Sequence, residues 1–221
     1  SHESVLILVL MEDTLGDKTK NMEKLNELIK VFSNLQGIGK KSAIRIAFDL
    51  LEKDEEQVMH LANTIISAYE SIKPCNICHN LTQNDICDIC LNDKKNRKII
   101  CVVENTRDVL AFENAGGYDG LYHVLGGKID PLNGVGINDL NISSLIKRLD
   151  DSKNKVEEVI LALNPDLEGE TTILYLSKII KEKDIKISRI ASGIPMGGNI
   201  EYTDMMTLMK SLEGRQVIYD E

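Results

Sequence analysis

Apolar residues recur at helical spacing in the first part of the chain and in short continuous runs in the second part. One helical face near the start carries Leu25, Leu28, Ile29 and Phe32. The pattern between residues 22 and 71 predicts three helices. The first ends near Ser33, the second runs from about Lys41 to Leu51, and the third begins after Asp54, a favourable N-cap.

From Ile99 onward, short apolar runs alternate with amphipathic segments. Four runs are candidate strands: Ile99–Val103, Leu121–Leu125, Val159–Leu163 and Ile185–Ile190. Apolar strands separated by helices are typical of a parallel sheet that is covered on both faces. The segment from Gly126 to Gly136 is rich in Gly, Pro and Asn, so a surface loop is expected there. The second part is therefore predicted to be an α/β domain.

Length and composition are those of a globular protein. The chain has 221 residues, 43% of them hydrophobic, and can bury a substantial core. No apolar run approaches the roughly 20 residues that a membrane-spanning helix needs, so a cytoplasmic protein is expected. The formal net charge of -9 excludes a protein that coats nucleic acid with its whole surface. Residues 1–21 are expected to be an extension or a cloning remnant.

Four of the five cysteines form two closely spaced pairs, Cys75 with Cys78 and Cys87 with Cys90. Two Cys-x-x-Cys pairs can place four thiolates about 2.3 Å from one tetrahedral zinc ion. Disulfides or four buried thiols are the alternatives, but neither explains the paired spacing. His79 could compete as a ligand, although four sulfurs suffice. One structural zinc ion per chain is predicted, and a site closed by four thiolates has no open position for catalysis.

A glycine turn, Gly37-Ile38-Gly39, separates the first two predicted helices and is followed by the cations Lys40, Lys41 and Arg45. Glycine accepts positive φ and leaves backbone amides uncovered, so a phosphate can approach the N-terminus of the second helix. Residues 22 to 48 carry five basic side chains against two acidic ones, whereas the whole chain is acidic. Such a site would bind the DNA backbone without reading the base sequence. The alternative is a plain helical hairpin with solvated lysines.

The turn resembles the helix-hairpin-helix family of DNA-binding motifs. The matching positions are Leu35, Gly37, Ile38, Gly39, Lys41, Ala43 and Ile44, while Gln36 and Lys40 depart from the usual pattern. The resemblance implies DNA binding by Gly37, Gly39, Lys40, Lys41 and Arg45.

Acidic residues cluster where two predicted strands end: Glu104 after the first, and Asp166, Glu168 and Glu170 after the third. Ligands of open α/β sheets bind at the carboxyl ends of strands, and carboxylates there can hold Mg²⁺ for phosphoryl transfer. Alternatively, these side chains only cap a helix and charge its N-terminus favourably.

The same residues resemble the Toprim domain of topoisomerases and primases, where a strand-end glutamate is joined by an Asp-x-Asp-x-Glu-Gly-Glu motif. Asn164 stands at the first aspartate of that motif. Losing this carboxylate lowers the negative charge offered to a cation, so weak Mg²⁺ binding at most and no catalysis are expected. A magnesium-dependent Toprim nuclease, with Glu104, Asp166 and Glu168 holding the ion, is the alternative.

The order of hairpin, four-cysteine motif and Toprim-like domain resembles the RecR family of bacterial recombination proteins over residues 22–221. Five strings carry the resemblance: 37–43, 103–104, 126–134, 164–170 and 193–201. The last is called Walker B-like in that family. No Gly-x-x-x-x-Gly-Lys-Ser/Thr loop accompanies it, so ATP binding is not expected.

This resemblance implies a recombination mediator that acts with RecO and RecF to load RecA onto gapped or single-stranded DNA. It also implies a nucleoid-associated protein that forms ring-shaped homotetramers or dimers, in which several basic hairpins hold DNA together. Lys41 and Arg45 match positions implicated in DNA binding. The acidic residues Glu104, Asp166, Glu168 and Glu170 are implied to dock partners or to be vestigial. A hub that only bridges proteins is a third hypothesis.

Together these features predict an α+β multidomain protein. The expected segments are the extension at 1–21, a helix-hairpin-helix domain at 22–72, a zinc finger at 73–97, a Toprim domain with a mainly parallel sheet at 98–192, and a Walker B-like motif with a C-terminal helix and strand tail at 193–221.

Overall fold

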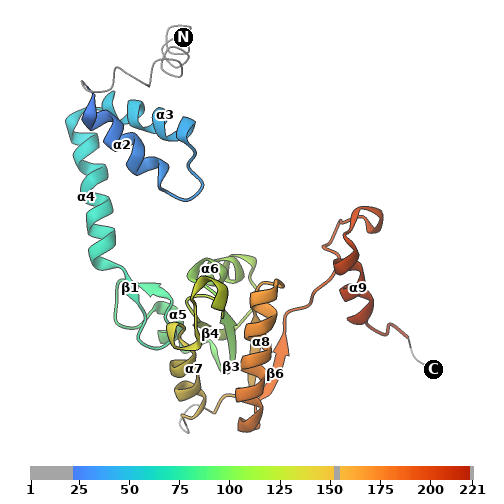
Figure 1. Cartoon of the computed structure of the whole chain (residues 1–221). Coiled ribbons are helices and arrows are strands. Elements are labelled where there is room, and N and C mark those ends of the chain that lie inside the picture. The colour runs from blue at the N-terminus through green and yellow to red at the C-terminus, as the bar shows by residue number, and fades with distance from the viewer. Residues whose placement is uncertain (1–21, 152–154, 220–221) are drawn as a thin grey trace. The chain divides into compact units, whose positions relative to one another are not determined.

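The computed structural model describes residues 22–151 and 155–219, so the extension expected at 1–21 lies outside the described residues. The chain divides into two compact units, with the boundary between Glu70 and Ser71 (Figure 1). No helix within these ranges is both long and apolar enough to cross a membrane.

The N-terminal unit contains the three predicted helices. They are α2 (Glu23–Ser33), α3 (Lys40–Leu51) and α4 (Glu55–Ser71). Leu25 of α2 and the small side chains of Ala43 and Ala47 on α3 are buried, so α2 and α3 form a packed hairpin. Asp54 caps α4 as expected, because its Oδ1 accepts a hydrogen bond from the amide of Gln57 at 2.8 Å.

A small segment with little regular structure begins the second unit. It contains a two-stranded antiparallel sheet, β1 (Lys73–Pro74) with β2 (Leu81–Thr82), and one turn of helix, α5 (Asp88–Leu91). Its buried cluster consists of cysteines, with only Ile86 and Ile89 packed beside them. Such a segment cannot bury enough apolar surface to fold by packing alone.

The rest of the second unit is built on a four-stranded sheet in the order β4-β3-β5-β6. All three strand pairs are parallel, which confirms the predicted α/β class. The strands are β3 (Asn96–Val103), β4 (Gly120–Val124), β5 (Glu158–Ala162) and β6 (Lys186–Arg189). The chain adds β4 on one side of β3 and then adds β5 and β6 on the other side, so a topological switch point lies between β3 and β5.

Helices cover both faces of this sheet (Figure 1). They are α6 (Thr106–Ala115), α7 (Ile142–Leu149) and α8 (Leu167–Ile180). Ile100 and Val102 of β3 pack in one core with residues of α7 and α8. Cys101 and Val103 point to the opposite face, where they pack with Val109 of α6. Because Glu104 directly follows β3, the strand order places it at the switch point.

Short 3-10 helices interrupt the connections and the tail. They are η2 (Pro131–Asn133), η3 (Ile137–Asp139), η4 (Lys181–Lys183) and η5 (Ile200–Tyr202), and α9 (Met205–Glu213) is the C-terminal helix. The expected loop at 126–136 therefore contains one turn of η2. No strand follows α9 up to Tyr219, the last described residue, so the strand expected in the tail is not found there. Its apolar residues Val217 and Ile218 are exposed, so no burial against the rest of the described chain favours a strand there.

Candidate functional site

The turn between α2 and α3 has the open backbone that phosphate binding requires. Gly37 has φ +82°, in the left-handed region that side chains other than glycine rarely adopt. The amide of Ile38 donates to the carbonyl of Leu35 at 3.1 Å and closes the turn. A Cβ atom added at Gly37 or Gly39 would meet no atom within 4 Å, so both glycines face open space in this unit.

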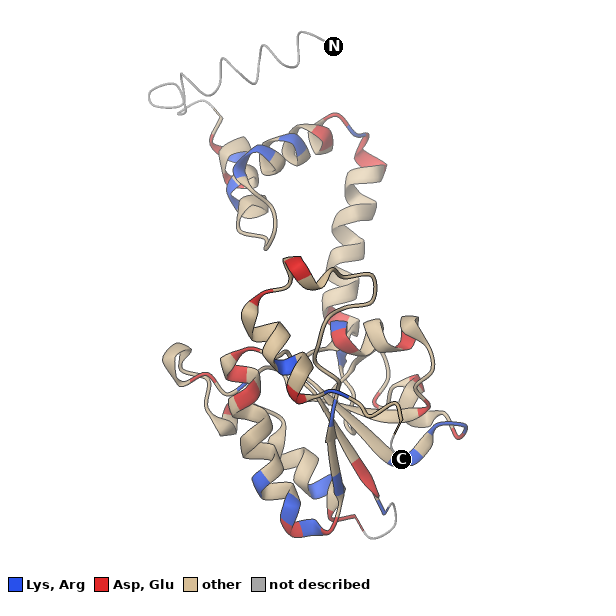
Figure 2. Cartoon of the chain, turned by 90° about the vertical axis from the view of Figure 1, so that its right-hand side faces the viewer, with Lys and Arg blue, Asp and Glu red and all other residues tan. Residues whose placement is uncertain are grey.

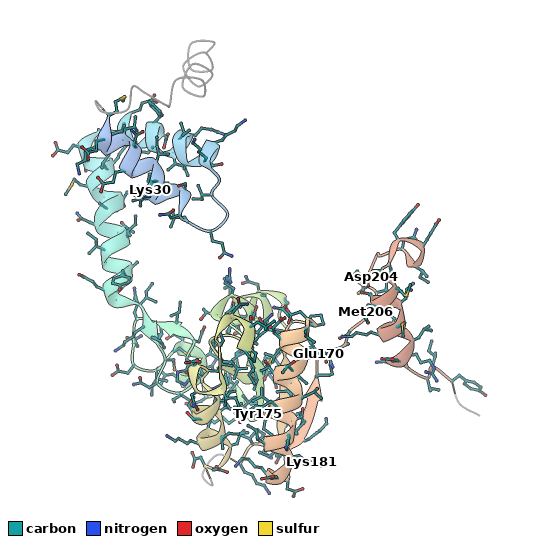
Figure 3. The ribbon with its side chains drawn as sticks, in the orientation of Figure 1. Lys30, Glu170, Tyr175, Lys181, Asp204 and Met206 are labelled. Carbon is teal, nitrogen blue, oxygen red and sulfur yellow. The ribbon has the colours of Figure 1, made fainter. Side chains whose placement is uncertain are left out.

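The N-terminus of α3 carries three exposed cations and no side-chain cap. Gly39 is the N-cap residue and has no side chain that could accept a hydrogen bond from the first-turn amides. An incoming phosphate therefore needs to displace no capping group from the positive end of the helix dipole. Lys40, Lys41 and Arg45 are all exposed around this end. Figure 2 marks Lys and Arg positions in blue along the helices of this unit, and Lys30 of α2, labelled in Figure 3, adds a further exposed cation.

The four paired cysteines come together in one buried cluster. Their Sγ atoms all lie within 4.8 Å of one another, and Cys78 Sγ is 3.5 Å from Cys87 Sγ. A tetrahedron with metal–sulfur bonds of about 2.3 Å has sulfur atoms about 3.8 Å apart, so the cluster has the size of a zinc site. The amides of Ile77 and Cys87 donate to Cys75 Sγ at 3.5 and 3.3 Å, as expected for a thiolate acceptor.

A structural zinc ion fits this donor set and this segment. Cys75, Cys78, Cys87 and Cys90 are all buried, and none forms a disulfide. Hydrogen bonding between Cys78 and Cys87 pushes the pKa of Cys78 upward and that of Cys87 down, as for sulfurs that share protons. Cys101 takes no part, because it is buried in β3, where burial raises the pKa of its thiol to about 12. Zinc bound by four thiolates would supply the folding energy that the small apolar core cannot.

Three direct contacts join the segment that carries the cysteines to β4 and α7. The amide of Val124 in β4 donates to the carbonyl of Cys78 at 2.8 Å. His79, with φ 61°, directs its Nε2 to Ser144 Oγ on α7 at 2.8 Å. Its ring also packs edge-on against that of buried His123, with centroids 5.3 Å apart. His79 therefore serves as a contact to α7 and is not directed at the cluster as a fifth ligand.

Arg148 of α7 places a cation beside the four sulfurs. It lines a small hollow together with Ile77 and Cys90. Burial lowers the pKa of its guanidinium, and the charges of the four thiolates oppose that shift. The sequence drew no attention to this residue, because a single arginine on an amphipathic helix normally lies in solvent.

The first two residues of the acidic cluster (Glu104, Asp166, Glu168 and Glu170) lie at the switch point, as the sequence predicts. Glu104 is 6% exposed, and both of its carboxylate oxygens accept hydrogen bonds from Asn164. The backbone amide of Asn164 donates to Oε1 at 2.6 Å, and its side-chain Nδ2 donates to Oε2 at 2.9 Å. An aspartate at position 164 could not donate the second bond and would repel Glu104.

Asp166 both caps α8 and pairs with a lysine. Its Oδ1 accepts a hydrogen bond from the amide of Gly169 at 2.8 Å. Its Oδ2 forms an ion pair with Lys128, whose Nζ also lies 3.9 Å from Glu104 Oε2. The hydrogen bond from Lys128 lowers the pKa of Asp166 and raises that of Lys128. The alternative role as a helix cap therefore exists here beside an ion pair that the sequence did not predict.

Glu170, the last acid of the motif and labelled in Figure 3, forms ion pairs with two further cations. It accepts two hydrogen bonds from Arg189 of β6, at 2.8 and 3.0 Å, and one from Lys210 of α9 at 2.9 Å. These bonds lower the pKa of Glu170 to about 2. The carboxylate therefore connects α8 to β6 and to the C-terminal helix, and it does not share a metal position with Glu104.

Four family models match the chain in the same order as these parts. The RecR helix-hairpin-helix model matches residues 25–69, and the model of the RecR zinc finger domain with four cysteines matches 72–92. A Toprim domain model matches residues 98–191, and the RecR C-terminal model matches 193–216. The helical hairpin, the cysteine cluster and the sheet with the acidic cluster thus each lie within a separate match.

Proposed function

The chain belongs to the RecR family of recombination mediators in DNA repair, and on this premise we propose that it grips the DNA backbone with the α2–α3 hairpin. The observation that carries the proposal is the uncapped N-terminus of α3, with open glycines before it and Lys40, Lys41 and Arg45 around it. Backbone amides, the helix dipole and these cations all favour phosphate. The proposed DNA-binding residues are Gly37, Gly39, Lys40, Lys41 and Arg45.

The proposed role is a clamp that acts with RecO and RecF to help load RecA onto gapped or single-stranded DNA. One hairpin with three cations binds DNA weakly, so several copies acting together are needed. Exposed apolar side chains support self-association into a tetramer or dimer. On α4 they are Met59, Leu61, Ile65, Ile66 and Tyr69, and on α9 they are Met205, Met206, Met209 and Leu212.

Zinc would hold the segment between the hairpin unit and the sheet in one conformation. Cys75, Cys78, Cys87 and Cys90 would bind the ion, and four thiolates leave it no position for substrate. Its contribution is therefore structural.

We further propose that the acidic cluster is a vestigial Toprim site and that the protein is not an enzyme. The nuclease alternative needs carboxylate oxygens directed at a shared Mg²⁺ ion. Glu104 is instead bonded to Asn164, and Glu170 to Arg189 and Lys210. Magnesium-dependent DNA cleavage that disappears in Glu104→Ala would establish the nuclease.

The clamp proposal is tested by changing Lys41 and Arg45 to alanine in the full zinc-loaded chain. Binding of single-stranded DNA is measured by fluorescence anisotropy over a range of salt concentrations. Each lost phosphate contact reduces the slope of log K against log salt by about 0.7, so a reduction of about 1.4 per engaged hairpin is expected. Lys178→Ala with Lys181→Ala removes the same charge outside the hairpin and is the matched control.

Zinc content and circular dichroism of both double variants must match the parent. If the hairpin variant then binds DNA with the parent's affinity and salt slope, the hairpin does not bind DNA. If the parent binds DNA only when a RecO-like partner is added, the bridging-hub hypothesis replaces the clamp.

A further inference from the structure

Lys128 is held over the carboxyl ends of β3 and β5 by backbone contacts on both sides of it. Before it, the amide of Gly126 donates to the carbonyl of Glu104 at 2.9 Å. After it, the amide of Ile129 donates to the hydroxyl of buried Thr172 on α8, also at 2.9 Å. These bonds fix the loop to both elements that carry the acidic cluster. Lys128 is therefore a positioned residue, unlike a lysine free to move on a surface.

The ammonium group of Lys128 lies between two carboxylates from different elements. It pairs with Asp166 at the start of α8 and lies 3.9 Å from Glu104 Oε2 after β3. Its side chain is 22% exposed and that of Glu104 is 8% exposed, so this charge is only partly screened by solvent. Removal of Lys128 would leave the buried carboxylate of Glu104 with no ion-pair partner among the residues that the structure describes.

All four carboxylate oxygens of Glu104 and Asp166 have electrostatic or hydrogen-bonding partners. Asn164 donates to both oxygens of Glu104, Gly169 donates to one oxygen of Asp166, and Lys128 pairs with the other. Mg²⁺ needs hard oxygen ligands in octahedral geometry and gives up its water molecules reluctantly. To bind here it would have to displace the ammonium group of Lys128 from Asp166 or approach this fixed positive charge.

We propose that the ammonium of Lys128 occupies the position at which the strand-end carboxylates would otherwise hold a divalent cation. The acidic cluster is then neutralised by a tethered lysine, and Mg²⁺ is excluded from it. The neutral Asn164 is part of the same arrangement, because it satisfies Glu104 without adding a negative charge that a metal ion would be needed to balance. This concerns the sheet alone and holds whether or not the hairpin binds DNA.

The test measures binding of Mn²⁺, a spectroscopic substitute for Mg²⁺, to the zinc-loaded chain by the loss of the free-ion electron paramagnetic resonance signal. At millimolar Mn²⁺, the parent should show no bound Mn²⁺ that excess Mg²⁺ can displace. Lys128→Met keeps the length of the side chain and removes its charge. It should bind Mn²⁺ with a dissociation constant at least roughly tenfold below the lower limit set for the parent. Lys98→Met is the matched control, because it also frees a carboxylate from an ion pair, that of Glu157, at the other end of the sheet.

A second readout protects against a poorly folded variant. The thermal midpoint of Lys128→Met should rise when Mg²⁺ is added, whereas those of the parent and of Lys98→Met should not. Tight, Mg²⁺-displaceable Mn²⁺ binding by the parent would overturn the proposal even if no variant folds. Equal Mn²⁺ binding by the parent and a folded Lys128→Met variant would also overturn it.

Discussion

Arg148 Nη1 donates a hydrogen bond to the carbonyl oxygen of Tyr122 at 2.6 Å. This bond ties α7 to the edge strand β4 and fixes the guanidinium beside the cysteine cluster. Its Nη2 is buried and has no hydrogen-bond partner among the described residues. Zinc with four thiolates carries a formal charge of about -2, and a fixed neighbouring cation offsets part of it.

Replacing Arg148 with leucine should therefore weaken zinc retention. We expect zinc to be released to a colorimetric chelator roughly 10-fold faster or more, as for other residues that support metal ligands from outside the coordination sphere. Arg148→Lys keeps the charge and should lie between the leucine variant and the parent. Lys147→Leu, on the exposed side of α7, is the control. Parent-like release from a folded Arg148→Leu variant would show that the guanidinium does not support the metal site.

Gly39→Ser should separate folding of the hairpin from DNA binding. Serine is at least as good an N-cap as glycine, so the free energy of unfolding should stay constant or rise by about a few tenths of a kcal/mol. The new hydroxyl would accept a hydrogen bond from a first-turn amide of α3, which glycine at the N-cap of the parent cannot do. Because that amide is then occupied, DNA affinity should fall. Urea unfolding and anisotropy check the two effects, and undiminished affinity would exclude these amides as phosphate ligands.

The ion pairs of Glu170 should stabilise the protein in a pH-dependent way. Bonds from Arg189 and Lys210 lower the pKa of Glu170 from 4.5 to about 2. Because the pKa of Glu170 is lower in the folded protein than in the unfolded chain, its ion pairs stabilise the fold fully at pH values above about 4.5. This stabilisation is lost as the pH falls from about 4.5 towards 2. Glu170→Gln should lower the free energy of unfolding by about 1 kcal/mol at pH 7.

The difference between parent and Glu170→Gln should shrink as the pH falls through that window. In both proteins the cysteine ligands become protonated at these pH values, which affects their stabilities equally. The quantity compared is therefore the difference in free energy of unfolding between the two proteins, measured by urea unfolding at each pH. Glu168→Gln, in the same turn of α8, controls for the lost helix-dipole interaction. A difference that is constant with pH would mean that Glu170 does not contribute through its charge.

Periodicity was sufficient to predict the three N-terminal helices and the four strands of the main sheet, because these helices are apolar on one face and β3, β4 and β5 contain buried apolar runs. The run Ile99–Val103 lies within β3, which begins three residues earlier at Asn96. The polar start of β3 has no apolar signal, and its backbone bonds alone extend the strand. The zinc site was also predictable, because two Cys-x-x-Cys pairs are the spacing typical of a tetrahedral four-thiolate site.

The partners of the acidic cluster could not be predicted, because they come from distant parts of the chain. Lys128 reaches Asp166 across 38 positions, and Lys210 reaches Glu170 across 40. Gly126 and Gly127 before Lys128 indicated a turn, but not where the turn directs the next side chain. In the sequence, only Asn164 in place of the first aspartate of the Toprim motif indicated that this cluster differs from a metal-binding Toprim site.

The hydrogen bond from Val124 to the carbonyl of Cys78 has a consequence for the fate of the metal-free chain. Strand β4 is an outer strand of its sheet, and its unpaired amides are a template on which another chain can add. While zinc holds the cysteine segment in place, the carbonyl of Cys78 occupies the amide of Val124 on this edge. A chain that loses its metal would expose it, so oxidation or chelation of the thiols is expected to lead to aggregation as well as to local unfolding.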